Sequence, residues 1–403
     1  MTDRLYYTDP YLRAFDATIA RVDRSADRLS VTLDRTAFYP TSGGQPFDTG
    51  HLGSLRVIDV VDEDDGSISH VAELGTENSE LKTGDAVHGA IDWERRFDHM
   101  QQHSGQHVLS ASFDRLFGVR TVSFHLGGVM STIDLAREMS PAEIAAAETE
   151  ANRIVWEDRP VTIRFTDADE AARLPLRKEP AREGTLRLID VEGFDLSACG
   201  GTHVARTGAI GVIAVASWDR FKGGQRLEFL CGGRALGGYR TLRDAMSASV
   251  RLLSVLPMEL PHAIERLQAD AKDQKRALIG LQNDLARYRA EELAASAEEI
   301  GACRLVARAI DADANGLKSL AAAITAKPGY LVVLVSTSTP TTVVIARSSD
   351  VQTSAQQLLQ GLIAEFGGRG GGRAEMSQGG GLVATPKSIF DVVRSLMRSQ
   401  NSI

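Results

Sequence analysis

Two short motifs, HSGQH and ACGGTH, constrain the fold most, because each has the spacing of a pair of metal ligands. His103 and His107 are four residues apart in a segment whose apolar spacing predicts a helix over 93–117, so both imidazoles leave the same helix face. Cys199 and His203 are also four residues apart, and the two glycines between them suit a loop that wraps around a metal. Imidazole and thiolate ligands together favour Zn²⁺. We therefore predict one Zn²⁺ per chain, bound by these four residues.

Each motif alone has an ordinary alternative, because such pairs are more often hydrogen-bonded side chains than metal ligands. Position 104 is Ser, so the Glu of an HExxH metalloprotease is missing. The zinc-deaminase pattern and the GxxxxGK[ST] nucleotide cradle are missing from the sequence as well. Four protein ligands can also fill a closed tetrahedral site. A purely structural zinc therefore remains an open alternative.

The order of apolar runs, turn signals and helical patterns predicts a multidomain α+β protein. A length of 403 residues suits two to four domains, and 43% hydrophobic with 24% charged residues is typical of folded globular chains. Apolar residues repeat at heptad spacing between Ile264 and Tyr288, which predicts a coiled-coil arm. The expected parts are a small N-terminal β-barrel (1–92), an α+β domain with the zinc site (93–245), a helical arm (246–300) and a C-terminal α/β glycine-rich domain (301–403).

The distribution of apolar and Cys residues predicts a cytoplasmic protein with no membrane partner. The longest apolar run, Tyr330–Val335, is far shorter than the roughly 20 residues that cross a bilayer. The first ten residues include charged side chains where a signal peptide would be apolar. Three scattered cysteines, Cys199, Cys231 and Cys303, are too few for a disulfide framework. We expect a reducing compartment.

Charge and glycine content single out the C-terminal region as a partner for an anionic polymer. The net charge is −8, but residues 301–403 hold 10 Lys and Arg against 6 Asp and Glu, a net +4. The segment Gly367–Gly381 contains eight glycines with Arg369 and Arg373 among them, which suits phosphate or an RNA backbone. A flexible linker is the alternative, but predicted helices on both sides favour an ordered loop.

Two further segments offer hydrogen-bonding groups beside glycine turns. In the first, Gly43 and Gly44 allow the backbone to approach a ligand, and Thr36 and Gln45 supply side-chain groups nearby. In the second, His125 precedes another glycine pair between two strand-like runs. Taken alone, both segments are also compatible with plain β-hairpins.

Taken together, the motifs resemble the editing half of alanyl-tRNA synthetase. TAFYPTSGGQPFDTG precedes HSGQH, CGGTH follows after about 90 residues, and GGRGGGRAEMSQGGG lies near the end. The resemblance covers nearly the whole chain and starts almost at the predicted barrel, so we expect a free-standing editing protein of the AlaX type, in its long form, without an aminoacylation domain. Gln106 stands where the synthetases commonly have Thr, and His125 where they usually have Gln; both resemble the free-standing branch.

The resemblance implies hydrolysis of tRNA(Ala) mischarged with serine, and also with glycine, at the zinc site. The implied substrate pocket consists of Thr36, Gly43, Gly44, Gln45, His125, Gly200, Gly201 and Thr202. In this pocket we expect His125 or Gln45 to orient water, the glycine-loop amides to hold the oxyanion and Thr36 to bind the serine hydroxyl. Residues 301–403, with Arg369 and Arg373, correspond to the family's tRNA-handling domain.

Three points stay open at this stage. A related HxxxH…CxxxH domain occurs in threonyl-tRNA synthetases, so another misacylated tRNA is an alternative substrate. A non-catalytic RNA-binding protein with structural zinc is a second alternative. Pairing of two chains through the helical arm or the C-terminal domain would give a homodimer.

Overall fold

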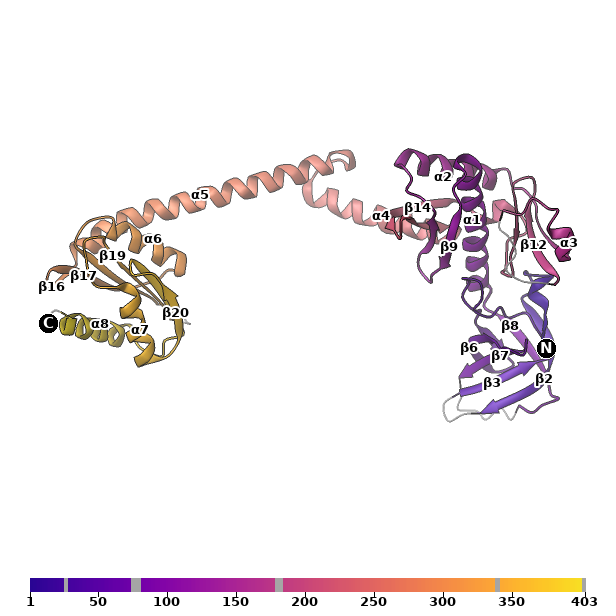
Figure 1. Ribbon diagram of the computed structural model, residues 1–403, viewed down its shortest axis with the longest axis horizontal. Helices are drawn as coiled ribbons and strands as arrows, with labels where there is room; N and C mark the ends of the chain where they lie inside the picture. The colour runs from indigo at the N-terminus through magenta and orange to yellow at the C-terminus, as the bar shows by residue number, and fades with distance from the viewer. Residues whose placement is uncertain (25–27, 74–80, 178–183, 338–340, 401–403) are drawn as a thin grey trace. The chain divides into compact units, whose positions relative to one another are not determined.

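The computed structural model describes residues 1–24, 28–73, 81–177, 184–337 and 341–400. The chain divides into two compact units, Met1–Ala248 and Ser249–Ile403. Each unit has its own hydrophobic cores. Figure 1 shows the helices and strands of the two units.

The first unit begins with a closed six-stranded barrel, which confirms the predicted β-barrel. Its strands alternate between buried and exposed residues, so that Phe15, Ala17 and Ile19 fill the interior from one strand. In spatial order the strands are β2 (Ala14–Arg24), β3 (Arg28–Leu33), β7 (Ile68–Glu73), β6 (Leu55–Asp62), β5 (Gly50–Leu52) and β8 (Ala86–Ile91). Pairing of β8 with β2 closes the barrel. Strands β1 (Asp3–Arg4) and β4 (Arg35–Thr36), with the 3₁₀ helix η1 (Leu5–Tyr7) between them, form a separate parallel pair.

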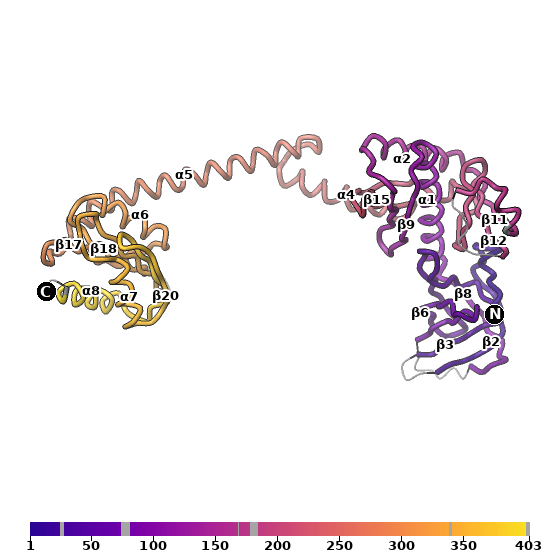
Figure 2. The backbone as a smooth tube through the Cα atoms, viewed as in Figure 1, coloured from indigo at the N-terminus to yellow at the C-terminus, as the bar shows by residue number. Residues whose placement is uncertain are grey.

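Helix α1 (Trp93–Phe117) follows the barrel and is the central element of the site. It ends at Gly118, whose left-handed conformation (φ 63°) lets its N–H bond to the carbonyls of Asp114 and Phe113. Most of its middle residues are buried, polar and apolar alike. The backbone trace in Figure 2 follows α1 past β9 (Thr121–Leu126) and α2 (Pro141–Trp156), and both elements contact it.

Two antiparallel sheets and two further long helices complete the first unit. One sheet has the order β14 (Ile213–Phe221), β15 (Gly224–Cys231), β10 (Ser131–Leu135) and β9 (Thr121–Leu126), and the other has β11 (Val161–Thr166), β12 (Leu186–Val191) and β13 (Asp195–Ala198). The helices are α2 (Pro141–Trp156), the short α3 (Ala168–Ala171), the 3₁₀ helix η2 (Thr207–Ile210) and α4 (Gly232–Leu253). The N-cap of α2 is Ser140, which forms a capping box with Glu143.

A fully buried ion pair fixes the barrel against α1. The Arg96 guanidinium on α1 donates to the Asp48 carboxylate at 2.5 Å and also to the backbone carbonyls of Pro10 and Ala37. These bonds compensate much of the cost of burying both charges. The turn that contains Gly43 and Gln45 is thereby held close to the helix that carries His103.

The second unit is one mixed sheet covered by helices on both faces. On one face of β18 (Tyr330–Ser336), Leu331, Val333 and Val335 pack with α7 (Ala355–Phe366) and α8 (Pro386–Gln400). On the other face, Val332 and Leu334 pack with α5 (Leu260–Ala295) and α6 (Ala314–Thr325). Burial on both faces explains the continuous apolar run in this strand. The sheet order is β16 (Glu298–Ile300), β17 (Cys303–Ile310), β18, β19 (Thr342–Arg347), β21 (Met376–Gly380) and β20 (Arg369–Gly372). The helices are η3 (Pro257–Glu259), α5 (Leu260–Ala295), α6 (Ala314–Thr325), α7 (Ala355–Phe366) and α8 (Pro386–Gln400).

The glycine-rich segment differs from the expected loop, because it forms the edge hairpin β20–β21. Gly370 and Gly379 face each other across the pair, and a Cβ on Gly370 would lie 2.5 Å from Cα of Gly379. The hairpin therefore needs glycine for close packing of its two backbones.

Candidate metal centre

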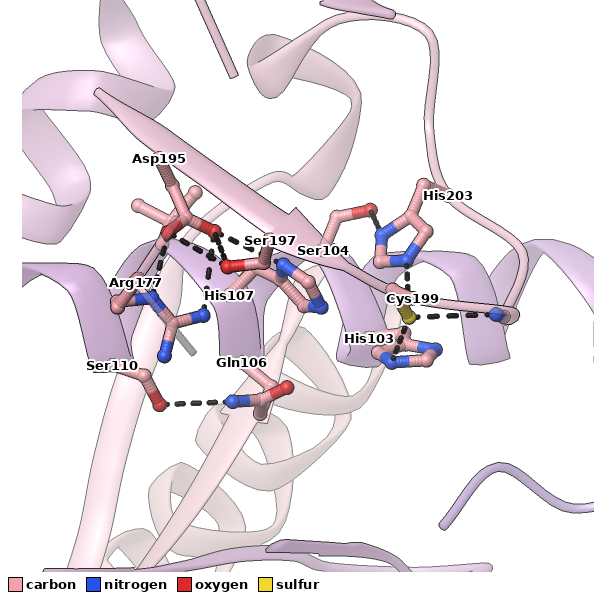
Figure 3. Close-up of polar contacts among 12 residues, drawn as sticks. His103, Ser104, Gln106, His107, Ser110, Arg177, Asp195, Ser197, Cys199 and His203 are labelled. Atoms are coloured by element: carbon pink, nitrogen blue, oxygen red, sulfur yellow. Dashed lines mark hydrogen bonds and ion pairs between the residues drawn. The ribbon is translucent and has the colours of Figure 1, made fainter. Parts of the chain in front are cut away.

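The structure brings the four residues of the two motifs into one cluster. Their ligand atoms all lie within 4.8 Å of one another. His103 and His107 come from successive turns of α1, and Cys199 and His203 from the loop after β13 (Figure 3). The Cys199 Sγ atom lies 3.4 Å from Nε2 of His103 and 3.3 Å from Nε2 of His203.

Each histidine is oriented by an oxygen atom that lies within hydrogen-bonding distance of its Nδ1 atom. Nδ1 of His103 donates to Oε1 of Gln45 at 2.8 Å, and Nδ1 of His107 donates to the Asp195 carboxylate at 3.1 Å. Nδ1 of His203 lies 3.2 Å from Oγ of Ser104. Such outer partners fix the tautomer and ring orientation of metal-binding histidines. The three Nε2 atoms are left to face the cluster.

The electrostatics of the cluster favour a thiolate among imidazoles. Burial alone raises the pKa of the Cys199 thiol, but the adjacent His103 and His203 hold it well below its usual range. Burial also lowers the pKa of His203, to about 3. Burial acts in the same direction on His107, but its hydrogen bond to Asp195 and its contact with Cys199 raise that pKa to about 9.

The donor set fits zinc on its chemistry. One thiolate and three imidazoles, each imidazole with an oxygen partner on its remote nitrogen, are typical ligands and outer partners of Zn²⁺. His103, His107, Cys199 and His203 would hold the ion.

Close packing of the ligand loop depends on Gly201 and Arg187. A Cβ on Gly201 would collide with Cε1 and Nδ1 of the His103 ring and would lie 2.9 Å from Oε1 of Gln45. The Arg187 guanidinium donates to the carbonyls of Cys199 at 2.7 Å, Gly201 at 2.9 Å and Tyr7 at 2.9 Å. The loop is therefore held from both sides.

A cavity of about 570 Å³ opens beside the cluster. This volume lies in the range of small-molecule binding sites. His103, His107 and Cys199 form one part of its wall. The polar and aromatic side chains that also line the cavity include Tyr7, Tyr39, Gln106, Thr121, Ser123, Phe124, Arg177, Arg187 and Ser197.

The structure does not place Thr36 or His125 on this cavity, contrary to the expectation from the sequence. The buried Thr36 hydroxyl donates to Nε2 of His70 at 2.8 Å and accepts from the Phe38 N–H at 3.1 Å. His70 receives that bond because its own Nδ1 donates to the Val31 carbonyl. His125 is an exposed residue of β9 that pairs with β10 and is outside the cavity wall. Neither side chain is positioned as predicted.

Gln45 and Thr202 have a positioning role instead of facing the cavity. The Gln45 side chain is fully buried; its Oε1 accepts from Thr202 N–H as well as from His103, and its Nε2 donates to Oγ1 of Thr202 at 2.8 Å. Its amide oxygen and amide nitrogen therefore both have partners within the protein, and Gln45 is not in the cavity wall where it was expected to orient water.

The predicted glycines divide between the cavity wall and the packing around it. Gly43, Gly200 and Gly201 line the cavity. Gly44 lies behind it, where its carbonyl accepts from Leu126 N–H at 3.0 Å and a Cβ would lie 2.9 Å from the Phe124 ring.

Arg369 and Arg373 lie in the second unit, where both are exposed. Arg369 is the first residue of β20, and Arg373 follows that strand in the turn to β21.

Sequence reasoning missed Asp195, the carboxylate partner of His107. Its other partners are Arg177, which donates at 2.6 Å, and Ser197, which donates at 3.0 Å. A signal for it was present, because residues 195, 197 and 199 alternate along a strand and therefore share one face. The carboxylate four residues before Cys199 could have been assigned to the same site.

Three family profiles match parts of the chain. Residues 12–95 match the tRNA synthetases class II (A) family, residues 186–228 the threonyl and alanyl tRNA synthetase second additional domain, and residues 302–398 the DHHA1 domain. The chain is also 32% identical to the alanyl-tRNA editing protein AlaX-L of Pyrococcus horikoshii, over 99% of this chain and 99% of that relative. The chain belongs to the alanyl-tRNA editing protein family. This confirms the resemblance of the motifs to the AlaX type in its long form.

The chain is also similar to alanine–tRNA ligases. It is 33% identical to those of Pyrococcus furiosus and Methanoregula boonei over 94% of its own length, and it spans 42% of each ligase. A solved structure of the C-Ala domain from Aquifex aeolicus alanyl-tRNA synthetase matches 25% of the chain at 20% identity, with a TM-score of 0.24. Among the described residues, none of the helices combines the length and the apolarity needed to span a membrane.

Proposed function

We propose that the chain hydrolyses tRNA(Ala) mischarged with serine, and also with glycine, at a zinc-dependent site. The observation that carries the proposal is the Cys-His₃ cluster in the wall of a 570 Å³ cavity. Membership of the alanyl-tRNA editing protein family supports the choice of tRNA(Ala) as substrate. In the reaction, a water oxygen bonds to the ester carbonyl carbon, the bond from that carbon to the ribose oxygen breaks, and the ribose oxygen takes a proton.

Bound zinc would supply polarisation of an ester oxygen or of water. The protein's contribution is mainly positional. Gln45 and Asp195 hold His103 and His107, and Arg187 holds the Cys199 loop. We assign the backbone amides of Gly43 and Gly200, both in the cavity wall, as donors to the ester oxygens of the substrate.

Binding of the tRNA body is assigned to the second unit. Arg369 and Arg373 are exposed on a hairpin of glycines, in a region with a net charge of +4. An arginine flanked by glycines can approach a phosphodiester closely and donate two hydrogen bonds to it. Glycines around it keep other side chains out of the way.

A homodimer through α5 is the oligomeric state that we propose. The heptad residues of α5 leave an apolar stripe 42% to 70% exposed, formed by Ile264, Leu267, Leu278, Leu281, Leu285 and Tyr288. An apolar heptad stripe suits pairing with a second copy of the same helix. Sedimentation equilibrium of wild type and Leu281→Lys tests this: the variant should be monomeric, and a monomeric wild type would contradict the proposal.

A structural zinc without hydrolysis is the second candidate, because four protein ligands can fill a tetrahedral site. Turnover of Ser-, Gly- and Ala-tRNA(Ala), with Ser-tRNA(Thr) in parallel, distinguishes the candidates. We expect hydrolysis of the Ser and Gly esters of tRNA(Ala) and little hydrolysis of the Ala ester. Turnover of none would favour the structural role, and preference for Ser-tRNA(Thr) would favour threonyl-type editing.

A further inference from the structure

Gln106 presents an unused hydrogen-bond acceptor beside the metal ligands. It lies on α1 between His103 and His107, lines the cavity and is only 3% exposed. Its Oε1 atom has no hydrogen-bond partner among the described residues. A buried acceptor without a partner destabilises the folded protein. A ligand that supplies a donor would remove this destabilisation.

The amide is held so that its nitrogen, not its oxygen, is bonded within the protein. Nε2 of Gln106 donates to Oγ of Ser110 at 2.9 Å (Figure 3), and the Thr121 hydroxyl donates to the same oxygen at 2.7 Å. Because Ser110 Oγ accepts both bonds, it fixes the nitrogen end of the amide against α1. The oxygen end has no such partner among the described residues.

The side-chain hydroxyl is the donor that distinguishes a seryl from a glycyl ester, because the α-amino group is common to both. The described lining residues include Arg177 and Arg187 but neither Asp nor Glu. A hydroxyl carries no charge and can donate one hydrogen bond to the amide oxygen.

We propose that Gln106 accepts a hydrogen bond from the side-chain hydroxyl of the aminoacyl group and thereby selects seryl over glycyl esters. Gln106 takes the hydroxyl-binding role expected of Thr36, whose own hydroxyl is already bonded to His70 and to the Phe38 N–H. This assignment deepens the proposed function and rests on its substrate class. Gln106 is therefore a specificity-determining residue.

Hydrolysis by two Gln106 variants of the full-length zinc protein tests the assignment. Gln106→Met removes the acceptor at similar side-chain length, and Gln106→Glu keeps an acceptor as the matched control. We expect the ratio of kcat/KM for Ser-tRNA(Ala) to that for Gly-tRNA(Ala) to fall about tenfold in the Met variant, and to stay closer to wild type in the Glu variant. Zinc content is measured in each protein, so that damage to the neighbouring ligands is recognised. An unchanged ratio, including equal slowing of both esters, would overturn the proposal.

Binding of non-hydrolysable analogues gives a readout that is independent of turnover. The probes are the seryl and glycyl amides of 3′-amino-3′-deoxyadenosine, titrated by calorimetry. Wild type should bind the seryl amide about tenfold more tightly than the glycyl amide, and Gln106→Met should lose this preference. Equal binding of both amides by wild type, or an unchanged preference in the variant, would overturn the inference. A preference that depends on Gln106, without hydrolysis of either ester, would support the inference and contradict the proposed function.

Discussion

Replacement of Gly201 by Ala should weaken zinc binding, because the ligand loop packs closely against His103. The added Cβ would collide with the His103 ring and lie 2.9 Å from Oε1 of Gln45, whereas carbon atoms pack at about 3.5 Å or more. The ring or the loop must therefore move by roughly 1 Å, and overpacking of this kind costs about 1 to 3 kcal/mol. If the cost falls on the metal-bound state, it corresponds to a loss of about 5- to 150-fold in zinc affinity.

Gly200→Ala is the matched control in the same loop. A Cβ there would contact only Tyr7, at 3.6 Å from its hydroxyl oxygen, which is an ordinary van der Waals distance. Competition with a chromophoric chelator measures the zinc affinity of wild type and both variants, and chemical denaturation of the metal-free proteins measures stability. We expect Gly200→Ala to stay near wild type and Gly201→Ala to bind zinc more weakly. Equal zinc affinity in the two variants would refute the packing argument.

Three further predictions concern the partner of His107, a buried histidine and the C-terminal arginines. Asp195→Asn should lower zinc affinity by about 10- to 100-fold in the same competition assay, because His107 loses its carboxylate partner. Burial lowers the pKa of His70 from 6.5 to about 4, so the folded state binds fewer protons than the unfolded chain between these values. The free energy of unfolding should therefore fall by about 2 kcal/mol from pH 7 to pH 5, and denaturation of His70→Gln should lack this contribution. Replacing Arg369 and Arg373 by Ala should raise KM for tRNA more than it lowers kcat, and steady-state assays at several salt concentrations should give a shallower salt dependence.

The ligand set could be predicted from the sequence because ligand spacing is a local property. A helix places residues four apart on one face, and two glycines allow a tight loop. The relative positions of the ligands within HSGQH and within CGGTH could therefore be predicted from each motif alone. The roles of Thr36 and Gln45 are not local. Thr36 is occupied by His70, 34 residues away, and Gln45 by Thr202, 157 residues away. Only the folded arrangement shows which of these polar groups are already bonded.

The helix α1 and the glycine hairpin show the same limit at the level of the fold. The apolar spacing predicted α1 correctly, but it could not predict that Gln102, Gln106 and Ser110 are buried as well, since each depends on partners within the folded unit or on the cavity. Glycines have low strand propensity, so the segment after Gly367 was expected as a loop. Pairing with β19 makes it an edge hairpin.

Hydrolysis of Ser-tRNA(Ala) by the same protein preparation before and after zinc removal tests the central claim most directly. The protein is stripped with a chelator, assayed, reloaded with one equivalent of Zn²⁺ and assayed again, with Cys199→Ala as the control for the site. We predict that activity disappears with the metal, returns with zinc in wild type and does not return in the variant. Full hydrolysis by metal-free protein, or equal activity of Cys199→Ala after reloading, would contradict a zinc-dependent editing site formed by His103, His107, Cys199 and His203.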